Sequence, residues 1–108
     1  MKLFAAYLKE RTGQTLIERE GGFATYQIDG EECYIVEIFV VPEIRRTGLA
    51  SRMADEISVL AKSQNCTYLK GTVDLRANGA RESILALIGY GFKPVRAVDE
   101  ILYFRKEL

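Results

Sequence analysis

Apolar and polar residues follow two different periods along this chain, and the period changes near clusters of glycine. In residues 2–11 apolar side chains recur three and four positions apart, which predicts a short helix ending near Gly13. Glycine-containing turns at 21–22 and 29–30 then separate three strand-like segments. These predicted strands cover residues 15–20, 23–28 and 33–41. The first part of the chain therefore predicts a helix followed by an antiparallel meander.

An amphipathic helix is predicted next, over residues 49–63. Its apolar face consists of Leu49, Met53, Ile57, Leu60 and Ala61. A strand over residues 68–75 follows it, because β-branched and other apolar residues alternate with polar ones there. The predicted inward face of that strand is Leu69, Val73 and Leu75.

The last third of the chain predicts a second helix and a final hairpin. The helix begins near residue 80, capped either by Asn78 or by Gly79 with Glu82 at the third helical position, and Gly91 ends it. Strands at 93–98 and 101–105 then pair around a two-residue turn.

The order of these elements, α-β-β-β-α-β-α-β-β, is typical of an α/β protein with a mixed sheet. Strands 33–41 and 68–75 are connected through a helix, so they can lie parallel, whereas the other strand pairs are hairpins. With 108 residues, of which 48% are hydrophobic, we expect one domain over residues 1–108.

Charge and cysteine usage narrow the function classes. Lysine plus arginine equals aspartate plus glutamate at 15 each, and the basic residues do not form the stripe that nucleic-acid binding usually needs. No apolar run approaches the roughly 18 residues of a membrane span, and the N-terminus does not resemble a signal peptide. Cys33 and Cys66 are unclustered and there is no histidine, which argues against a metal site or a Cys-His nucleophile. We expect a cytoplasmic protein with two reduced thiols.

The loop between strand 33–41 and helix 49–63 carries the candidate chemistry. Pro42 ends the strand, Gly48 allows close approach of the backbone to a ligand, and Ala50 adds little bulk where the helix begins. The free amides of the first helical turn and the pair Arg45-Arg46 add positive charge. The loop therefore suits an anion such as a pyrophosphate.

Neither the Walker P-loop nor the dinucleotide fingerprint is present, and the pattern that remains is Arg45-x-x-Gly48-x-Ala50. Together with the preceding strand, the following helix and Gly91-Phe92 downstream, it resembles the acetyl-CoA signature of the Gcn5-related N-acetyltransferase (GNAT) family. The resemblance runs from about residue 16 to the C-terminus and begins at the family's second strand. The plainer alternative is an ordinary strand–turn–helix with a glycine for the turn.

The resemblance implies a fold in which strands 33–41 and 68–75 splay apart into a V that holds the pantetheine arm of acetyl-CoA. The amide of Val40 would then be an oxyanion donor, a role worth a few kcal/mol when preorganised. The residues implied in cofactor binding are Ile38, Phe39, Val40, Arg45, Arg46, Thr47, Gly48, Leu49, Ala50, Asn78 and Ser83. No metal is implied.

Glu37 is the candidate general base that would take the proton from the attacking amine. It is a lone carboxylate in an apolar strand, where burial would make it a stronger base. Alternation places it on the opposite face from Val36, Ile38 and Val40. The alternative is a half-exposed or ion-paired carboxylate with no catalytic role.

The second helix departs from the family pattern, in which a tyrosine would protonate the leaving thiolate. Counting back from Gly91-Phe92 places Leu87 at the position of the family's tyrosine and Ser83 at the position of its alanine. Tyr90 lies three residues beyond Leu87 and is the candidate substitute for the acid; packing alone is the alternative.

We therefore expect an N-acetyltransferase that moves an acetyl group from acetyl-CoA to a primary amine of unknown size. A CoA-binding module with weak or no catalysis is the alternative, and a small interaction domain without CoA is a third. We also expect a homodimer, because residues 101–104 are apolar on both faces of their strand and need cover on each side.

Overall fold

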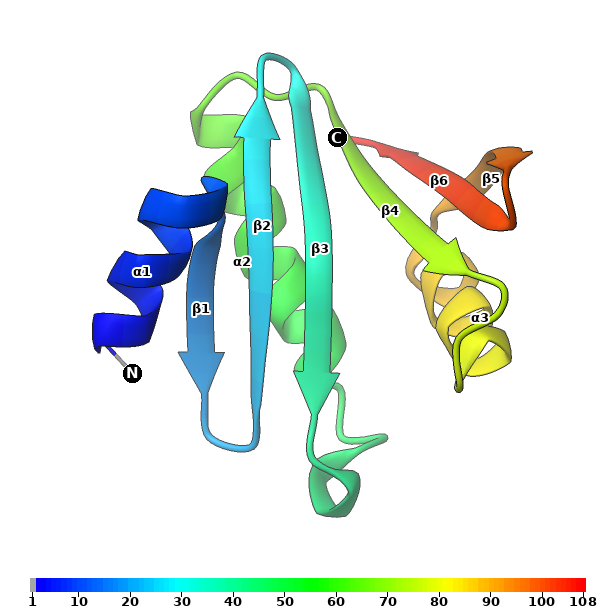
Figure 1. Ribbon diagram of the computed structural model, residues 1–108, viewed down its shortest axis with the longest axis horizontal. Helices are drawn as coiled ribbons and strands as arrows, with labels where there is room; N and C mark the ends of the chain where they lie inside the picture. The colour runs from blue at the N-terminus through cyan, green and yellow to red at the C-terminus, as the bar shows by residue number, and fades with distance from the viewer. Residues whose placement is uncertain (1) are drawn as a thin grey trace.

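The computed structural model describes residues 2–108 and confirms the predicted order of helices and strands (Figure 1). The helices are α1 (Lys2–Thr12), α2 (Leu49–Ser63) and α3 (Ala80–Tyr90), and a 3-10 turn at Pro42–Ile44, which the sequence did not predict, precedes α2. The strands are β1 (Thr15–Arg19), β2 (Gly22–Asp29), β3 (Glu32–Val40), β4 (Tyr68–Asp74), β5 (Lys93–Val98) and β6 (Ile101–Glu107). No helix within residues 2–108 is long and apolar enough to cross a membrane.

All the strands form one six-stranded sheet in the order β1-β2-β3-β4-β6-β5. The β3–β4 pair is parallel, as predicted, and every other pair is antiparallel. The strand at the C-terminus, β6, lies inside the sheet, paired with β4 and β5. The edge strand is β5, and all its residues are exposed.

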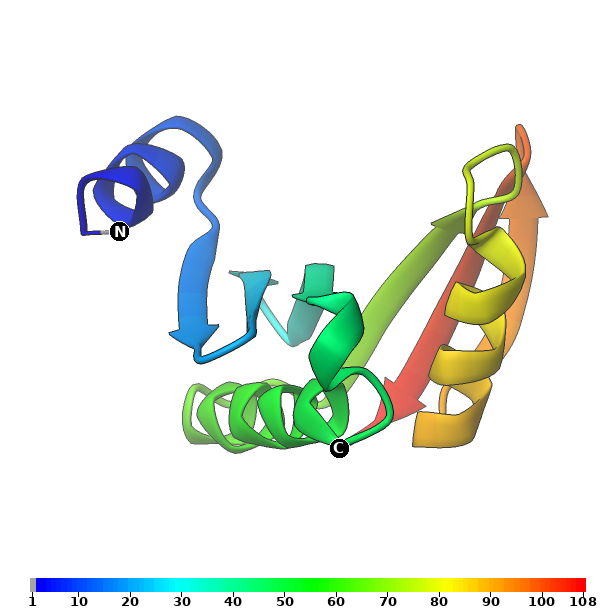
Figure 2. The same cartoon turned by 90° about the horizontal axis from the view of Figure 1, so that it is seen from below.

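Two helices lie on opposite sides of the sheet, with α1 beside β1 on one side and α2 across β2 and β3 on the other (Figure 2). The core lies under α2, which buries Leu49, Met53, Ala54, Ile57 and Ala61. Leu60, predicted on this apolar face, is 38% exposed, and Ala54 is buried instead. On β4 the inward positions are Leu69, Gly71 and Val73; Leu75 follows the end of the strand and is exposed.

A β-bulge in β3 changes which side chains face α2. Tyr26 pairs with Ile35, but the preceding residue Thr25 pairs with Glu37, so Val36 is the extra residue. Strict alternation would place Ile35 and Glu37 on one face. Because of the bulge, Ile35 faces α2 and Glu37 faces away from it, on the side of Thr25.

The two parallel strands separate soon after they meet. Pairing is confined to Glu32–Tyr34 of β3 and Tyr68–Lys70 of β4. Beyond this point β4 turns away and the strands open into a V (Figure 1). Gly71 marks the divergence: a Cβ there would lie 3.1 Å from Cδ2 of Leu87, so the missing side chain lets α3 pack closely on β4.

Candidate active site

A cavity of about 280 Å³ occupies the opening between β3 and β4 and continues between α2 and α3. This volume is near the lower end of ligand sites, which span about 300–1,000 Å³, and suits a slender arm rather than a whole nucleotide. Its lining residues are Ile35, Val36, Glu37, Ile38, Ala50, Ser51, Ala54, Gly71, Thr72, Ser83, Ala86, Leu87, Tyr90 and Phe92. Four separate elements thus contribute one continuous wall.

The backbone of β3 faces the opening where β4 has left it. The amide of Val41 donates to the carbonyl of Gly21 at 2.8 Å, so by antiparallel alternation the N–H of Val40 points away from β2. Of the three backbone residues predicted to bind the cofactor, Ile38 lines the cavity, while Phe39 and Val40 lie beyond its lining. The orientation of Val40 suits the predicted oxyanion role.

The anion-binding loop presents free amides at the start of α2. Gly48 is the N-cap residue, with φ of 88°, a left-handed conformation that favours glycine. The first helical hydrogen bond runs from the amide of Arg52 to the carbonyl of Gly48. The amides of residues 49–51 therefore have no acceptor within the helix. Ala50 and Ser51 bring this turn to the cavity wall.

The cations of this loop differ in how they are held. Nε of Arg45 donates to the Val40 carbonyl at 2.9 Å, and its guanidinium lies 5.9 Å from the Phe39 ring centre. Arg46 is exposed. Nη1 of Arg52, in the first turn of α2, donates to the Thr47 carbonyl at 3.0 Å. Three guanidinium groups thus come from residues 45–52.

Two predicted binding residues occupy positions that limit their side-chain contribution. Leu49 is buried in the core, so only its backbone can meet a ligand. Asn78 is exposed, lies outside the cavity lining and does not cap α3, because Gly79 is the N-cap residue. Ser83, by contrast, lies in the cavity wall as predicted.

Glu37 lines the cavity but is exposed, so the expectation of a buried carboxylate is wrong. It has no cation within 4.0 Å among residues 2–108, and the ion-paired alternative is not observed. Opposite it lies Thr25, which is 4% exposed and whose Oγ1 has no hydrogen-bond partner within the described part of the chain. A polar atom with unused hydrogen-bonding capacity therefore lies next to the carboxylate.

Tyr90 lies in the cavity wall, and its hydroxyl donates to Oδ1 of Asp55 at 2.6 Å. Burial and the neighbouring Asp55 raise the pKa of Tyr90. The phenol therefore stays protonated at neutral pH, with its proton directed to α2. Leu87, at the position of the family's tyrosine, lies against Gly71. Sequence reasoning missed Asp55, because nothing local in a polar helix face indicates a partner 35 residues away.

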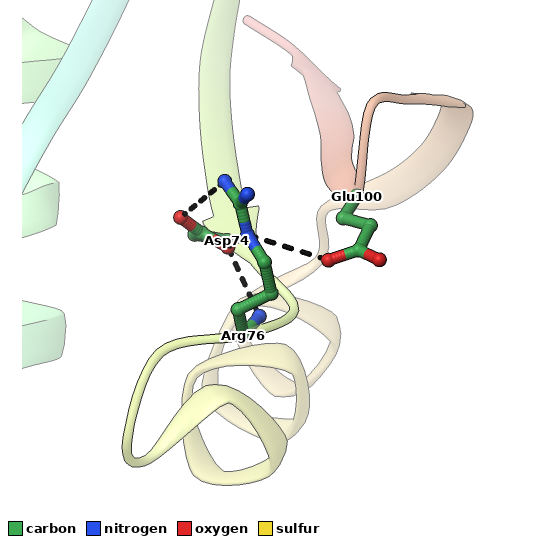
Figure 3. Close-up of polar contacts among 3 residues, drawn as sticks. All are labelled: Asp74, Arg76 and Glu100. Carbon is green, nitrogen blue, oxygen red and sulfur yellow. Dashed lines mark hydrogen bonds and ion pairs between the residues drawn. The ribbon is translucent and has the colours of Figure 1, made fainter.

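The far side of the V is held by an exposed ion cluster (Figure 3). Nε of Arg76 contacts Oδ1 of Asp74 at 3.0 Å and Oε2 of Glu100 at 3.3 Å. Hydrogen bonds from Arg76 lower the pKa of Asp74. The amide of Leu75 also donates to the Glu100 carbonyl at 2.9 Å. The end of β4 is thus tied to the β5–β6 turn.

The family model "Acetyltransferase (GNAT) family" matches residues 2–85 of the sequence. The chain belongs to the GNAT family. None of the curated proteins gives a significant sequence match. GNAT enzymes use acetyl-CoA as co-substrate. The open V between β3 and β4 has room for the slender arm of such a molecule, and the free amides of residues 49–51 are donors for its phosphate groups.

Solved structures show the same fold at low sequence identity. A GNAT-family protein from Desulfovibrio desulfuricans superposes with a TM-score of 0.82 at 15% identity, over 98% of this chain and 76% of that one. The PaiA N-acetyltransferase from Thermoplasma acidophilum, solved with coenzyme A, gives 0.75 at 15% identity, over 99% and 70%. A GNAT acetyltransferase from Elizabethkingia anophelis, solved with acetyl-CoA bound, gives 0.74 at 16% identity, over 99% and 82%.

Within residues 2–108 no group of three or more histidine, cysteine, aspartate or glutamate side chains is placed to hold a metal ion. The two cysteines are free and buried. Burial, followed by the nearby Cys66 and Glu32, raises the pKa of Cys33 to about 12, so this thiol is not a nucleophile at neutral pH.

Proposed function

We propose that this protein transfers the acetyl group of acetyl-CoA to the nitrogen of a primary amine. The observation that carries the proposal is the cavity between the splayed strands, whose wall includes both the start of α2 and the carboxylate of Glu37. The pantetheine arm would occupy the cavity, and the pyrophosphate would meet the free amides and the guanidinium groups of residues 45–52. In this proposal the pyrophosphate site, the thioester site and the basic group of Glu37 all adjoin the same cavity.

In the proposed step the amine nitrogen attacks the thioester carbonyl. The N–C bond forms and the C–S bond breaks, one proton leaves the nitrogen, and one proton is taken up by the departing thiolate. A free alkyl amine has a pKa near 10.4, so it has to be deprotonated before or during attack. The amide of Val40, which points away from β2, would stabilise the negative charge on the carbonyl oxygen.

Glu37 is the proposed proton acceptor, acting directly or through water. Its exposure on the side of the sheet away from α2 leaves it accessible to an incoming amine. The hydroxyl of Thr25, on the same side of the sheet, is buried and has no hydrogen-bond partner among residues 2–108, so any water that relays the proton would be held by Glu37 itself. Because Glu37 is exposed, bulk water can also take the proton, so we expect a modest contribution from this residue rather than a dominant one.

Tyr90 is the proposed source of the proton for the thiolate. Its hydrogen bond to Asp55 opposes this role, because the phenol proton is already donated. A CoA-binding module with weak catalysis is therefore the second candidate function, and the observation that favours it is the pair Leu87 and Tyr90, of which neither presents a free hydroxyl to the cavity.

Release of free thiol from acetyl-CoA in the presence of a mixed panel of primary amines tests the proposal. Enzymatic release that depends on the amine supports the transferase. Micromolar CoA binding by calorimetry without any release supports the binding module instead. Absence of both binding and release contradicts the two functions together.

A further inference from the structure

The acceptor has to reach the thioester from the face of the sheet that α2 and α3 leave open. On β4, Gly71 faces α3, because a Cβ there would meet Leu87. Its neighbour Thr72 therefore faces the opposite side, although it also lines the cavity. Figure 1 looks onto this side, with α2 behind the strands. The side chains around Thr72 on the open face would consequently meet the body of the acceptor.

A row of side chains crosses four strands on this open face at the level of the cavity. Oη of Tyr34 and Oγ1 of Thr72 are 2.8 Å apart, bridging β3 and β4 where pairing ends. Thr72 is the direct partner of Tyr103 on β6, and Tyr103 is the partner of Arg96 on the edge strand β5. We call Tyr34, Lys70, Tyr103 and Arg96 the cation–tyrosine row.

Two cations of this row rest on aromatic rings. Cζ of Arg96 lies 4.5 Å from the ring centre of Tyr103. Nζ of Lys70 lies 4.7 Å from the ring centre of Tyr34 and 5.6 Å from that of Tyr103. All three distances are within the range of cation–π attraction, which orients a cation without neutralising it. Tyr103 thus has a positive charge near it on each side.

The neighbouring carboxylates leave these charges largely unmatched. Within residues 2–108 no carboxylate lies within 4.0 Å of Arg96, and Lys70 has only Glu32, with its Oε2 at 3.9 Å, beyond hydrogen-bonding distance. By contrast, Arg105 and Arg76 are bound by Glu107 and Asp74 at 2.6 and 3.0 Å. These two cations are therefore held by carboxylates, whereas the two beside Tyr103 have no carboxylate at hydrogen-bonding distance within residues 2–108.

We propose that the cation–tyrosine row binds an anionic group on the acceptor, so that the substrate class is a primary amine with a carboxylate or phosphate at its other end. The inference rests on the proposed function. Neighbouring strands are about 4.8 Å apart, so Arg96 lies at least two strand spacings from the cavity edge of β4. The amine and the anion must then be separated by a chain of about five or more bonds. An α-amino acid joined through its own α-amine is too short.

A matched set of acceptors tests the length and the charge separately. We expect kcat/KM for 6-aminohexanoate to exceed that for 6-aminohexanamide, which has the same length and no charge, by about tenfold, as for one charge-assisted contact. Glycine, with its carboxylate adjacent to the amine, should gain no such advantage over glycinamide. A parallel arm with 6-aminohexyl phosphate decides which anion is preferred, and a preference for either one supports the proposal.

Variants then assign the effect to the row. Arg96→Gln and Lys70→Gln should each reduce the advantage of 6-aminohexanoate over 6-aminohexanamide several-fold, through KM for the acid. Lys62→Gln, which removes one exposed cation from α2, is the control and should keep the full advantage. Equal kcat/KM for the acid and the amide in the wild-type protein would overturn this inference while leaving the transferase intact. No turnover with any amine would overturn both.

Discussion

The hydroxyl of Tyr90 donates a 2.6 Å hydrogen bond to Oδ1 of Asp55 and so joins α3 to α2 beside the cavity. The two helices contact the sheet on either side of the opening between β3 and β4, α2 against β2 and β3 and α3 against β4. This bond therefore holds the walls of the proposed cofactor site at a set separation. It also ties the one phenol in the cavity wall to a carboxylate.

Tyr90→Phe tests whether this phenol has a chemical role as well as a bridging one. If Tyr90 protonates the thiolate, kcat should fall by about 10²-fold with little change in CoA affinity. The lost hydrogen bond, which is partly exposed, should lower the free energy of unfolding in urea by about 1 kcal/mol. Asp55→Ala is the matched control, because it removes the bond and keeps the phenol. A normal kcat in Tyr90→Phe together with reduced stability would show that Tyr90 joins the two helices and has no chemical role.

Glu37→Gln tests the proposed base at an exposed position. We expect kcat to fall by about tenfold, less than for a buried base, while CoA affinity measured by calorimetry stays the same. Glu20→Gln makes the same change in the exposed turn between β1 and β2 and should leave kcat unaltered. If both variants behave alike, the proton is taken by water or by another group.

Gly48→Val tests the anion-binding loop. A side chain at φ of 88° is strained, and a Cβ would lie 3.2 Å from Nη1 of Arg52, so the Arg52 side chain has to shift. Acetyl-CoA affinity should fall by tenfold or more, which is about 1.4 kcal/mol. Gly30→Val is the matched control: it also has positive φ, but it lies in the turn at the other end of β3. Equal losses of acetyl-CoA affinity in both variants would show that this loop does not form the binding site.

Stability should depend on pH through Cys33. Burial raises the pKa of this thiol from its ordinary value of 9.0 to about 12. Between these values the folded chain keeps a proton that the unfolded chain loses, so this contribution is complete below pH 9 and declines as pH rises toward 12. The loss is roughly 1.4 kcal/mol per pH unit. Urea unfolding at pH 8 and pH 10.5 should show a steeper decline for the wild type than for Cys33→Ala; parallel declines would contradict the assignment.

We still expect a homodimer, now through the β5–β6 hairpin and its exposed edge. Val95 and Val98 of the edge strand are 58% and 47% exposed. A stable interface needs about 1,000 Å² in total, so more than these two side chains must contribute. Light scattering after size exclusion should give twice the chain mass of 12.2 kDa, and Val95→Lys should return it to the monomer. A monomer that persists at increasing concentration would contradict the prediction.

Local sequence patterns were sufficient for the elements and for the strand–loop–helix arrangement around Gly48. The helical period of residues 49–63, the proline after β3 and Gly48 each act within a few residues, and the structure confirms what they predict. The parallel pairing of β3 and β4 followed from the helix between them. The internal position of β6 did not follow, because the order of strands in a sheet depends on pairings between distant segments.

The sequence by itself thus determined the order of the strands and helices, the position of the loop around Gly48 and the resemblance to the family. Short-range backbone preferences and the period of apolar side chains are sufficient for all three. Only the tertiary structure decided how the site is arranged. The bulge at Val36 turns Glu37 to the open face, and no alternation along one strand reveals a register shift against its partner. The bond between Tyr90 and Asp55 and the cation–tyrosine row join residues from different elements. Such contacts exist only once the chain has packed, since the energies that select them act through space between segments far apart in sequence.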